Sequence, residues 1–468
     1  MPRVCPVKSI WDEKEVVRVL KEKHAIKLWH WLIWDAASKG GMAEGAEGSL
    51  ESAPFDKWIV ARDEVQAILS GDFRISTSKV VETLHSARGD STKLLIELQD
   101  GHRIETVIMK HAKHSTVCVS SQIGCKMGCR FCATGTMGII GDLTSGEIIE
   151  QLMHANQVTK IRNVVMMGMG EPLNNYENVK QAVLFMIDDR RFGLSPRQVT
   201  VSTVGVLKNM KRLSDEMPLV NLALSLHAPS QEIRVKIVPS ASAHHIDRLL
   251  QAVDYHIQRG GNKFNLSLGV EIDDVEELEK TMASSSSSSF ALKKKKLHQS
   301  GIMIEYILIQ DVNDLEEHAH LLGHLLRPRR EFVLLNLIPY NPTSVAEDYK
   351  PPTEESVQRF FEILKSDQYG IHTRVRGEKG QDIEGACGQL ALVKPSTARS
   401  GMDIEDYGDV DRRGEKKDKP KRGGKTSTSV DNSGTQRLAC VGAWLSLPFL
   451  CMSIIALRHV RSFSSIRI

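Results

Sequence analysis

The strongest constraint on the fold of this chain is an alternation of apolar runs with helical patterns from Val117 to about Val393. Near-continuous apolar runs are typical of parallel strands that are buried on both faces. Together with a strand that enters at Val117, the alternation predicts six β/α units, an α/β fold closed into a partial (β/α)6 TIM-like barrel. Functional side chains of such barrels gather at the carboxyl ends of the strands. The five later strands are expected at Ile161–Met167, Gln198–Thr203, Leu219–Leu226, Ile302–Leu308 and Phe332–Ile338.

Three cysteines, Cys125, Cys129 and Cys132, lie in one stretch with the spacing Cys-x3-Cys-x2-Cys. Cysteine thiolates hold iron–sulfur clusters, and four of them normally saturate a four-iron cluster. Three thiolates leave one iron open to bind a small molecule. The alternatives are a zinc knuckle or three structural cysteines, but zinc needs a fourth ligand, and the next candidate, His154, lies far along the chain. We therefore expect a 4Fe–4S cluster with one open iron.

The composition places the protein in a reducing compartment. Hydrophobic residues make up 41% and charged residues 25% of the 468 residues, which is ordinary for a soluble globular protein. The five cysteines outside the loop are scattered, so they do not form a disulfide framework. The N-terminal residues lack the pattern of a signal or transit peptide, and we expect a cytoplasmic location, with an organelle interior as the alternative. The net charge of +3 permits an RNA partner without arguing for one.

The sequence pattern of residues 1–115 predicts two small structural units. Residues 1–70 predict a helical accessory domain, with helices at Ser9–Ala37 and Phe55–Leu69. The tryptophan-rich run Leu28–Trp34 indicates a packed core between helices, with stacking on nucleic-acid bases as the alternative. Residues 71–115 predict a β adaptor, in which two alternating runs around Asp100 and Gly101 form a β-hairpin.

Three segments do not follow the barrel pattern. A low-complexity insertion at about 260–300, with a serine run and Lys293–Lys296, predicts a disordered loop whose lysines are either solvated or in contact with RNA phosphates. Residues 396–437 predict a disordered tail. In residues 438–468, the apolar stretch 439–457 has about the length needed to span a bilayer, so it is either a C-terminal membrane anchor or an extension without that role.

The sequence around the cysteines resembles the RlmN/Cfr family, the radical S-adenosylmethionine (SAM) methyltransferases that act on adenine in RNA. The match rests on Cys118–Cys125, Gly168–Leu173 and Asp382–Leu390, and it spans roughly Val117 to Leu392. The resemblance implies a radical SAM barrel whose open iron binds SAM, and an N-terminal domain used in RNA binding. The chain departs from the family at Ile237–His245, which lacks an expected Asn-Arg-containing stretch, and this puts substrate contacts there in doubt.

Polar residues at the strand ends are binding candidates in a barrel, and the resemblance assigns several of them to SAM. Gly170 and Glu171 match a Gly-Glu-Pro motif that receives the amino group of SAM. The other residues that match the SAM pocket are Ser202, Ser225, Leu226, His227 and Asn341.

Cys387 lies in an Ala-Cys-Gly-Gln-Leu sequence. An isolated intracellular cysteine is more often a small buried hydrophobe than a nucleophile, but the resemblance implies a cysteine that carries a methyl group. Carbon 2 of adenine is electron-poor, so the electrophilic methyl of SAM cannot be transferred to it directly. The resemblance implies that the Cys387 thiolate takes a methyl from one SAM, and that a 5′-deoxyadenosyl radical from a second SAM activates this methyl to add to the ring. Cys118 matches the thiol that then releases the product and leaves a disulfide, and Glu105 matches the proton acceptor.

The interpretation is therefore carbon-2 methylation of adenine in large-subunit rRNA, with tRNA as a second substrate. One alternative is carbon-8 methylation, which uses the same residues. Another is a non-catalytic iron–sulfur or zinc module that binds RNA, in which Cys387 and Glu171 would have no role. The expected partners are rRNA, tRNA and an electron donor protein of the flavodoxin or ferredoxin type. A membrane is a partner only if residues 439–457 form an anchor, and we expect a monomer.

Overall fold

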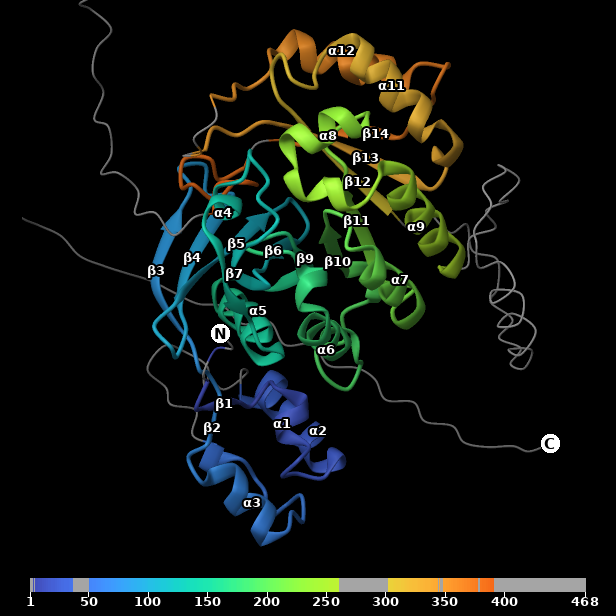
Figure 1. The fold of residues 1–468 in the computed structure, drawn as a ribbon. Helices are drawn as coiled ribbons and strands as arrows, with labels where there is room; N and C mark the ends of the chain where they lie inside the picture. The colour runs from blue at the N-terminus through green and yellow to red at the C-terminus, as the bar shows by residue number, and fades with distance from the viewer. Residues whose placement is uncertain are drawn as a thin grey trace, which may run out of the picture. The chain divides into compact units, whose positions relative to one another are not determined.

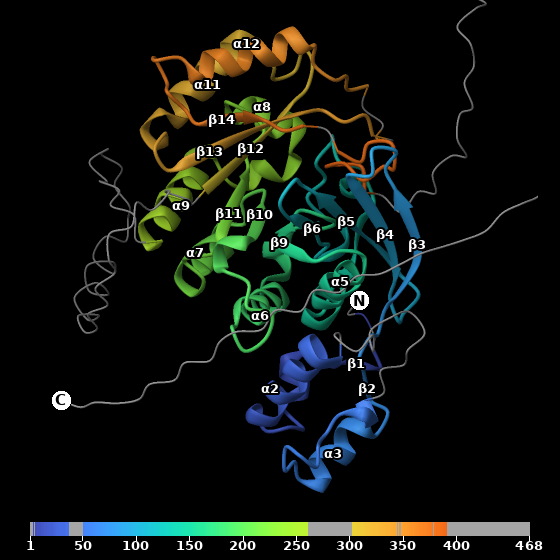
Figure 2. The same ribbon diagram turned by 180° about the vertical axis from the view of Figure 1, so that it is seen from behind.

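One ten-stranded sheet organises the part of the chain that the structure describes (Figures 1 and 2), with the strand order β14-β13-β12-β11-β10-β9-β6-β5-β4-β3. The structure is a computed structural model and describes residues 3, 5–36, 50–260, 302–343, 345, 348–377 and 379–390. These residues all belong to a unit that spans residues 1–400.

Seven adjacent strands of this sheet run parallel and form the partial barrel. Six of them confirm the predicted strands, and the seventh, β14, has only three residues, too few for a recognisable apolar run. The strands are β6 (Ser115–Cys118), β9 (Ile161–Met166), β10 (Val199–Thr203), β11 (Asn221–Ser225), β12 (Ile302–Leu308), β13 (Val333–Pro339) and β14 (Thr373–Val375).

Helices cover the outer face of the parallel strands (Figure 1). The helix after the cysteine loop starts with a capping box, in which the Thr144 side chain and the Glu147 side chain each satisfy a free backbone N–H of the first turn. The covering helices are α5 (Ser145–Val158), α6 (Tyr176–Ile187), α7 (Leu207–Glu216), α9 (Ile246–Arg259), α11 (Glu316–Leu326) and α12 (Glu354–Lys365). The short helix α8 (Gln231–Ile237) lies instead at the carboxyl ends of β10 and β11. The short 3-10 turns are η3 (Pro172–Asn175), η4 (Pro196–Gln198), η5 (Pro239–Ala243) and η6 (Arg327–Arg329).

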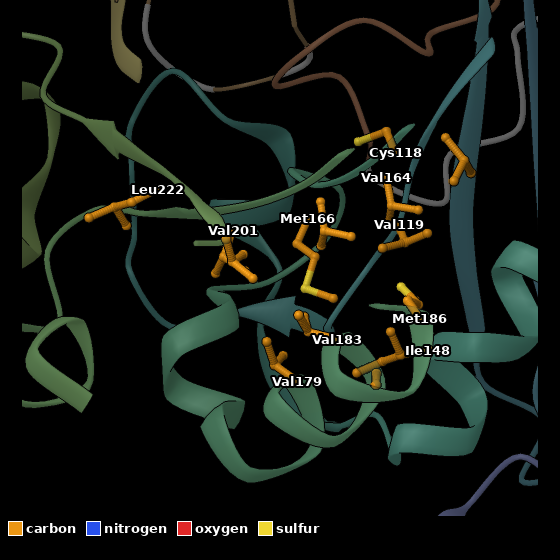
Figure 3. Packing of buried hydrophobic residues seen from close by; sticks show 14 of the residues in the cluster. Cys118, Val119, Ile148, Val164, Met166, Val179, Val183, Met186, Val201 and Leu222 are labelled. Carbon is orange, nitrogen blue, oxygen red and sulfur yellow. The ribbon is translucent and has the colours of Figure 1, made fainter. Parts of the chain in front are cut away.

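The core lies between the sheet and these helices. Figure 3 shows Met166 of β9 and Val201 of β10 above Val179 and Val183 of α6. All four side chains are fully or almost fully buried. Burying apolar side chains of this size contributes about 1.5–3 kcal/mol each, so this layer fixes where the strand ends lie.

The predicted β-hairpin is confirmed as β4 (Ser91–Glu97) and β5 (Arg103–Lys110), which pair antiparallel. A third strand, β3 (Lys79–His85), pairs with β4. Because β5 also pairs with β6, the adaptor continues the barrel sheet instead of forming a sheet of its own.

The N-terminal segment packs against α6 through its tryptophans. The ring centroids of Trp29 and Phe185 lie 5.0 Å apart, and those of Trp11 and Phe185 lie 6.3 Å apart. Trp29 is fully buried, which confirms the packed-core interpretation for this residue. The expected helix at Phe55–Leu69 begins only at Arg62. The elements are β1 (Lys8–Ser9), α1 (Glu13–Val16), α2 (Glu22–His30), the π-helical turn η1 (Trp31–Ala36), η2 (Leu50–Ser52), α3 (Arg62–Leu69) and β2 (Phe73–Arg74).

The predicted insertion after Gly260, the tail at 396–437 and the apolar segment at 438–468 lie outside the described residues. Within the described ranges, none of the helices has both the length and the apolar character that a bilayer crossing requires.

Candidate active site

The cysteine loop is held by a small hairpin of β7 (Gln122–Cys125) and β8 (Gly138–Asp142). At Gly124 a φ of 75° is combined with a very close approach, because a Cβ there would lie 2.0 Å from the Gly138 carbonyl oxygen. Only glycine fits such a position. Within the loop, the Cys132 N–H donates to the Cys129 carbonyl at 3.1 Å, and the one-turn helix α4 (Ala133–Thr136) follows. The loop is therefore tight enough to direct its three thiols to one side.

The three cysteines line a cavity of about 140 Å³, which we call the thiol cavity. Of the residues assigned to SAM from the sequence, Gly170, Glu171, Ser202, Ser225 and His227 line the same cavity. Leu226 is buried behind this wall, and Asn341 lies on the wall of a second cavity described below. The structure thus brings together side chains that come from the ends of β9, β10 and β11, as a barrel requires.

Burial makes the loop thiols reluctant to ionise. It raises the pKa of Cys125 to about 12 and the pKa of Cys129 well above the usual range, where the neighbouring Cys132 and Cys125 thiolates add to the effect. Burial also raises the pKa of Cys132. Thiols of this kind lose their protons when metal cations lie against them. Three soft thiolate donors around one cavity fit an iron–sulfur cluster. A cluster is larger than one ion, and among the described residues no three His, Cys, Asp or Glu side chains could hold a single metal ion.

Glu171 places a carboxylate on the wall of the thiol cavity. Its Oε1 accepts from the Leu173 N–H at 3.0 Å, and its Oε2 accepts from the Val204 N–H at 2.9 Å. The side chain is only 3% exposed, and burial raises its pKa to about 7. Gly170, at a φ of 98°, brings the backbone so close to Gln122 that a Cβ would lie 2.5 Å from the Gln122 Cβ. A buried carboxylate at such a wall fits a cationic group such as an ammonium.

His227 is fixed as a neutral imidazole. Its Nδ1 accepts from the Ile307 N–H at 3.1 Å, which leaves the proton on Nε2. Burial lowers its pKa to about 3. The backbone of His227 has a φ of 62°, a conformation that non-glycine residues adopt at a cost and that often marks a functional site.

Arg234 is a residue that the sequence did not reveal. It is 1% exposed, and its guanidinium donates to the carbonyl oxygens of Val204 at 2.6 Å, Leu226 at 3.0 Å and Ser225 at 3.2 Å. These bonds tie the end of β10 to the end of β11. A single arginine in the helical pattern of α8 has no sequence feature that separates it from a surface arginine, so no signal could have found it.

The loop that carries Cys387 is hydrogen-bonded both to the segment after β13 and to the helix α4 that follows the cysteine loop. Asn341 Nδ2 donates to the Cys387 carbonyl at 3.3 Å, and the Ala133 N–H donates to the Gly388 carbonyl at 2.7 Å. Gln381 Nε2 in turn donates to Asn341 Oδ1 at 2.6 Å. As a result Cys387 lies on the wall of the thiol cavity, although it is far from the cysteine loop in the chain.

Cys118 and Glu105 approach this loop from the sheet side. Cys118, at the end of β6, is 7% exposed, and its pKa is raised to about 12 by burial first and by the Cys387 thiolate second. Glu105 forms a buried ion pair with Lys93 at 3.0 Å, and Lys93 also donates to the Glu384 carbonyl at 3.3 Å. Neither Cys118 nor Glu105 lines the cavities at Cys387 that are described here.

A second cavity of about 560 Å³, which we call the barrel chamber, adjoins the thiol cavity. The two cavities share Met167, Glu305, Ile338, Arg376 and Cys387 as wall residues. The barrel chamber is lined by apolar side chains together with amides, hydroxyls and basic side chains, and the basic ones include Arg197, Arg374 and Lys379. The sequence did not predict it, because its walls are single inward-facing residues from many strands.

A cysteine loop at the mouth of a partial barrel, facing a buried carboxylate, defines a radical SAM enzyme, and residues 119–284 match the Radical SAM superfamily. The ribosomal RNA large subunit methyltransferase N of Nitrosopumilus maritimus (strain SCM1) is 36% identical over 330 residues, which cover 68% of this chain and 82% of that protein. The dual-specificity RNA methyltransferase RlmN 1 of Myxococcus xanthus (strain DK1622) is 37% identical over 352 residues, covering 74% of this chain and 86% of that protein. The chain belongs to the RlmN family of radical SAM methyltransferases.

The fold is also similar to a solved structure. The crystal structure of a radical SAM methyltransferase from Sphaerobacter thermophilus matches with a TM-score of 0.62 and 30% identity, and the match covers 83% of this chain and 99% of that chain. The protein is thus a radical SAM methyltransferase, whose cofactors are an iron–sulfur cluster and SAM.

Proposed function

We propose that this protein methylates carbon 2 of an adenine base in RNA, with large-subunit rRNA and tRNA as substrates. The observation that carries the proposal is the position of Cys387 on the wall shared by the thiol cavity and the barrel chamber. A cysteine there can take a methyl group on one side and present it to a base on the other. The names of the relatives, which are RNA methyltransferases, support RNA as the substrate.

The residues divide the work as follows. Cys125, Cys129 and Cys132 hold the cluster, and Glu171 pairs with the ammonium of SAM, with Gly170, Ser202, Ser225, Leu226, His227 and Asn341 completing the pocket. When bound, the cluster and SAM supply an electrophilic methyl group and a hydrogen-abstracting radical. The Cys387 thiolate would bond to the methyl carbon of one SAM as the sulfonium–methyl bond breaks and S-adenosylhomocysteine leaves, so Cys387 carries the group that is transferred. Glu105 would take the proton lost from the ring, and the electron that the adduct gives up would pass to the cluster. The Cys118 thiolate would then attack the Cys387 sulfur and break its bond to the transferred carbon, which takes up a proton to become the methyl group of the product, and a Cys118–Cys387 disulfide remains.

The remaining partners follow from this chemistry. The cluster must be reduced in each turnover, and we propose an acidic electron donor protein of the flavodoxin or ferredoxin type. We further propose that the protein acts as a monomer in the cytoplasm, and that the N-terminal helical segment contacts the RNA.

The test is the identity of the product nucleoside. The protein, reconstituted with iron and sulfide under anaerobic conditions, is incubated with SAM, a reductant and rRNA or tRNA transcripts, and the digested RNA is analysed by mass spectrometry. We expect 2-methyladenosine. If the product is 8-methyladenosine, the protein methylates carbon 8 and the carbon-2 assignment is wrong. SAM cleavage with no methylated RNA would contradict an RNA substrate. No SAM turnover from a protein with an intact cluster would favour a non-catalytic module.

A further inference from the structure

Glu305 lies at the boundary between the two cavities and has a carboxylate oxygen without a partner. The residue is in the middle of β12 and lines both the thiol cavity and the barrel chamber. Its side chain is 3% exposed. Its Oε2 accepts from Asn336 Nδ2 at 2.7 Å, and Arg374 Nε fixes Asn336 by donating to Asn336 Oδ1 at 2.9 Å. Its Oε1 is buried and has no hydrogen-bond partner among the described residues.

An arrangement of this kind points to a ligand. Buried polar atoms in folded proteins nearly always have a hydrogen-bond partner, so a buried carboxylate oxygen without one, on a residue that lines two cavities, calls for an external donor. The carboxylate cannot turn freely to find another partner, because Asn336 holds its other oxygen. Burial raises the pKa of Glu305, and the nearby charges of Arg376 and Arg374 oppose this.

The chemistry of the barrel chamber indicates which ligand. Its volume of about 560 Å³ lies within the range of small-molecule sites. Basic side chains share its wall, and one of them, Arg197, is exposed to solvent. Cationic side chains around a chamber with both apolar and polar walls suit a nucleotide whose phosphates stay at the surface while its base is taken out of the stack.

We propose that the barrel chamber receives the target nucleotide of the RNA, and that Glu305 Oε1 accepts a hydrogen bond from the exocyclic amino group of the target adenine. The proposal rests on the proposed function, since it names the group that recognises the substrate base. The amino group is the only N–H donor of an adenine base in RNA, and a carboxylate oxygen can only accept. Because Cys387 belongs to the same shared wall, a base held by Glu305 lies beside the thiol that carries the methyl group.

The test compares two RNA substrates, one with adenosine at the methylated position and one with purine riboside, which lacks the amino group. We expect the wild-type protein to prefer adenosine in kcat/KM by about 10- to 100-fold, the effect of one charge-assisted hydrogen bond. In Glu305→Gln, Asn336 holds the amide oxygen and the amide NH₂ faces the amino group of the base. Its preference should fall to within about threefold of unity. Glu331→Gln, at an exposed position after α11, should keep the preference.

The preference is a ratio, so a general loss of activity does not affect it. Equal losses on both substrates, with the wild-type preference retained, would overturn the proposal and assign Glu305 to SAM or to the fold. If Glu305→Gln is too slow to assay, the ratio of the dissociation constants for the two RNAs replaces kcat/KM under the same criterion. A wild-type protein that methylates neither RNA would contradict the proposed function, while the binding ratio would still decide the role of Glu305.

Discussion

The thiol cavity and the barrel chamber meet at Cys387 and differ in their chemistry. The thiol cavity is about 140 Å³ and is lined by buried thiols and two buried carboxylates, Glu171 and the shared wall residue Glu305. The barrel chamber is about 560 Å³ and is lined by amides, basic side chains and apolar side chains such as Val165 and Met303. The first is suited to a cluster and a cationic cofactor, and the second to a polyanionic substrate. The comparison teaches that a small set of shared wall residues separates the generation of the reactive group from its use.

The largest effect is expected from Cys125→Ala, which removes one of the three cluster ligands. Two thiolates cannot hold the cluster, so both the iron–sulfur absorbance and all SAM cleavage should be lost. Visible spectroscopy after anaerobic reconstitution and chromatography of 5′-deoxyadenosine measure this. Cys5→Ala, whose thiol lines neither cavity, is the matched control. If Cys125→Ala kept an iron–sulfur spectrum like that of the control, the thiol cavity would not be the site of the cluster.

Cys387→Ala should separate the function of the thiol cavity from that of the barrel chamber. The cluster should remain, because its ligands are unchanged, while methylation of RNA should fall to background for lack of a methyl carrier. Iron content and mass spectrometry of the digested RNA report the two properties on one sample. Methylated RNA from this variant would show that the shared wall does not carry the methyl group.

Cys118→Ala should stop the reaction after the methyl carbon has joined the base. With no second thiolate to attack the Cys387 sulfur, the RNA should stay covalently bound to the protein. A band of reduced mobility in denaturing electrophoresis, sensitive to ribonuclease, would be the sign of this adduct. If Cys118→Ala instead turned over without any adduct, another group would have to be the resolving thiol.

Glu171→Gln should weaken the binding of SAM, which the thiol cavity receives, and leave the binding of RNA unchanged. Loss of the charge that faces the ammonium should raise the KM for SAM by about tenfold. The carboxylate is the binding form and its pKa is about 7, so SAM affinity should fall as the pH decreases through 7. In the Gln variant this pH dependence should disappear. A larger change in the KM for RNA than in that for SAM would place Glu171 on the substrate side.

Arg197→Ala should give the smallest effect, a weaker binding of RNA at the barrel chamber with no change in SAM binding. Loss of one exposed cation should weaken RNA binding by a few fold and lower the slope of log affinity against log salt by about 0.7, the value for one single-strand phosphate contact. Arg359→Ala, on the outer helix α12 with a side chain 59% exposed, is the control. An unchanged salt slope would exclude Arg197 as a phosphate contact.

The sequence predicted most of the fold because the signals are local. The near-continuous apolar runs identified six parallel strands to within a few residues, and the Asp100-Gly101 turn identified the hairpin. It did not predict β14, whose Arg374 and Val375 are exposed and carry no apolar pattern. Nor did it predict Arg234 or Glu305, since a charged residue gives no sign in the sequence of whether it will be buried.

The sequence by itself determined the donor set that we propose for the cluster, because Cys125, Cys129 and Cys132 lie on one loop and their spacing alone keeps them together. Only the tertiary structure decided that Cys387 joins them. The bonds from Ala133 to Gly388 and from Asn341 to Cys387 connect segments that are distant in the chain. They require the cysteine loop, which follows β7 of the small β7-β8 sheet, to pack against the segment that follows β13 of the large sheet. The barrel chamber arises in the same way, since each strand contributes at most three residues to its wall and the cavity exists only once the strands are packed side by side.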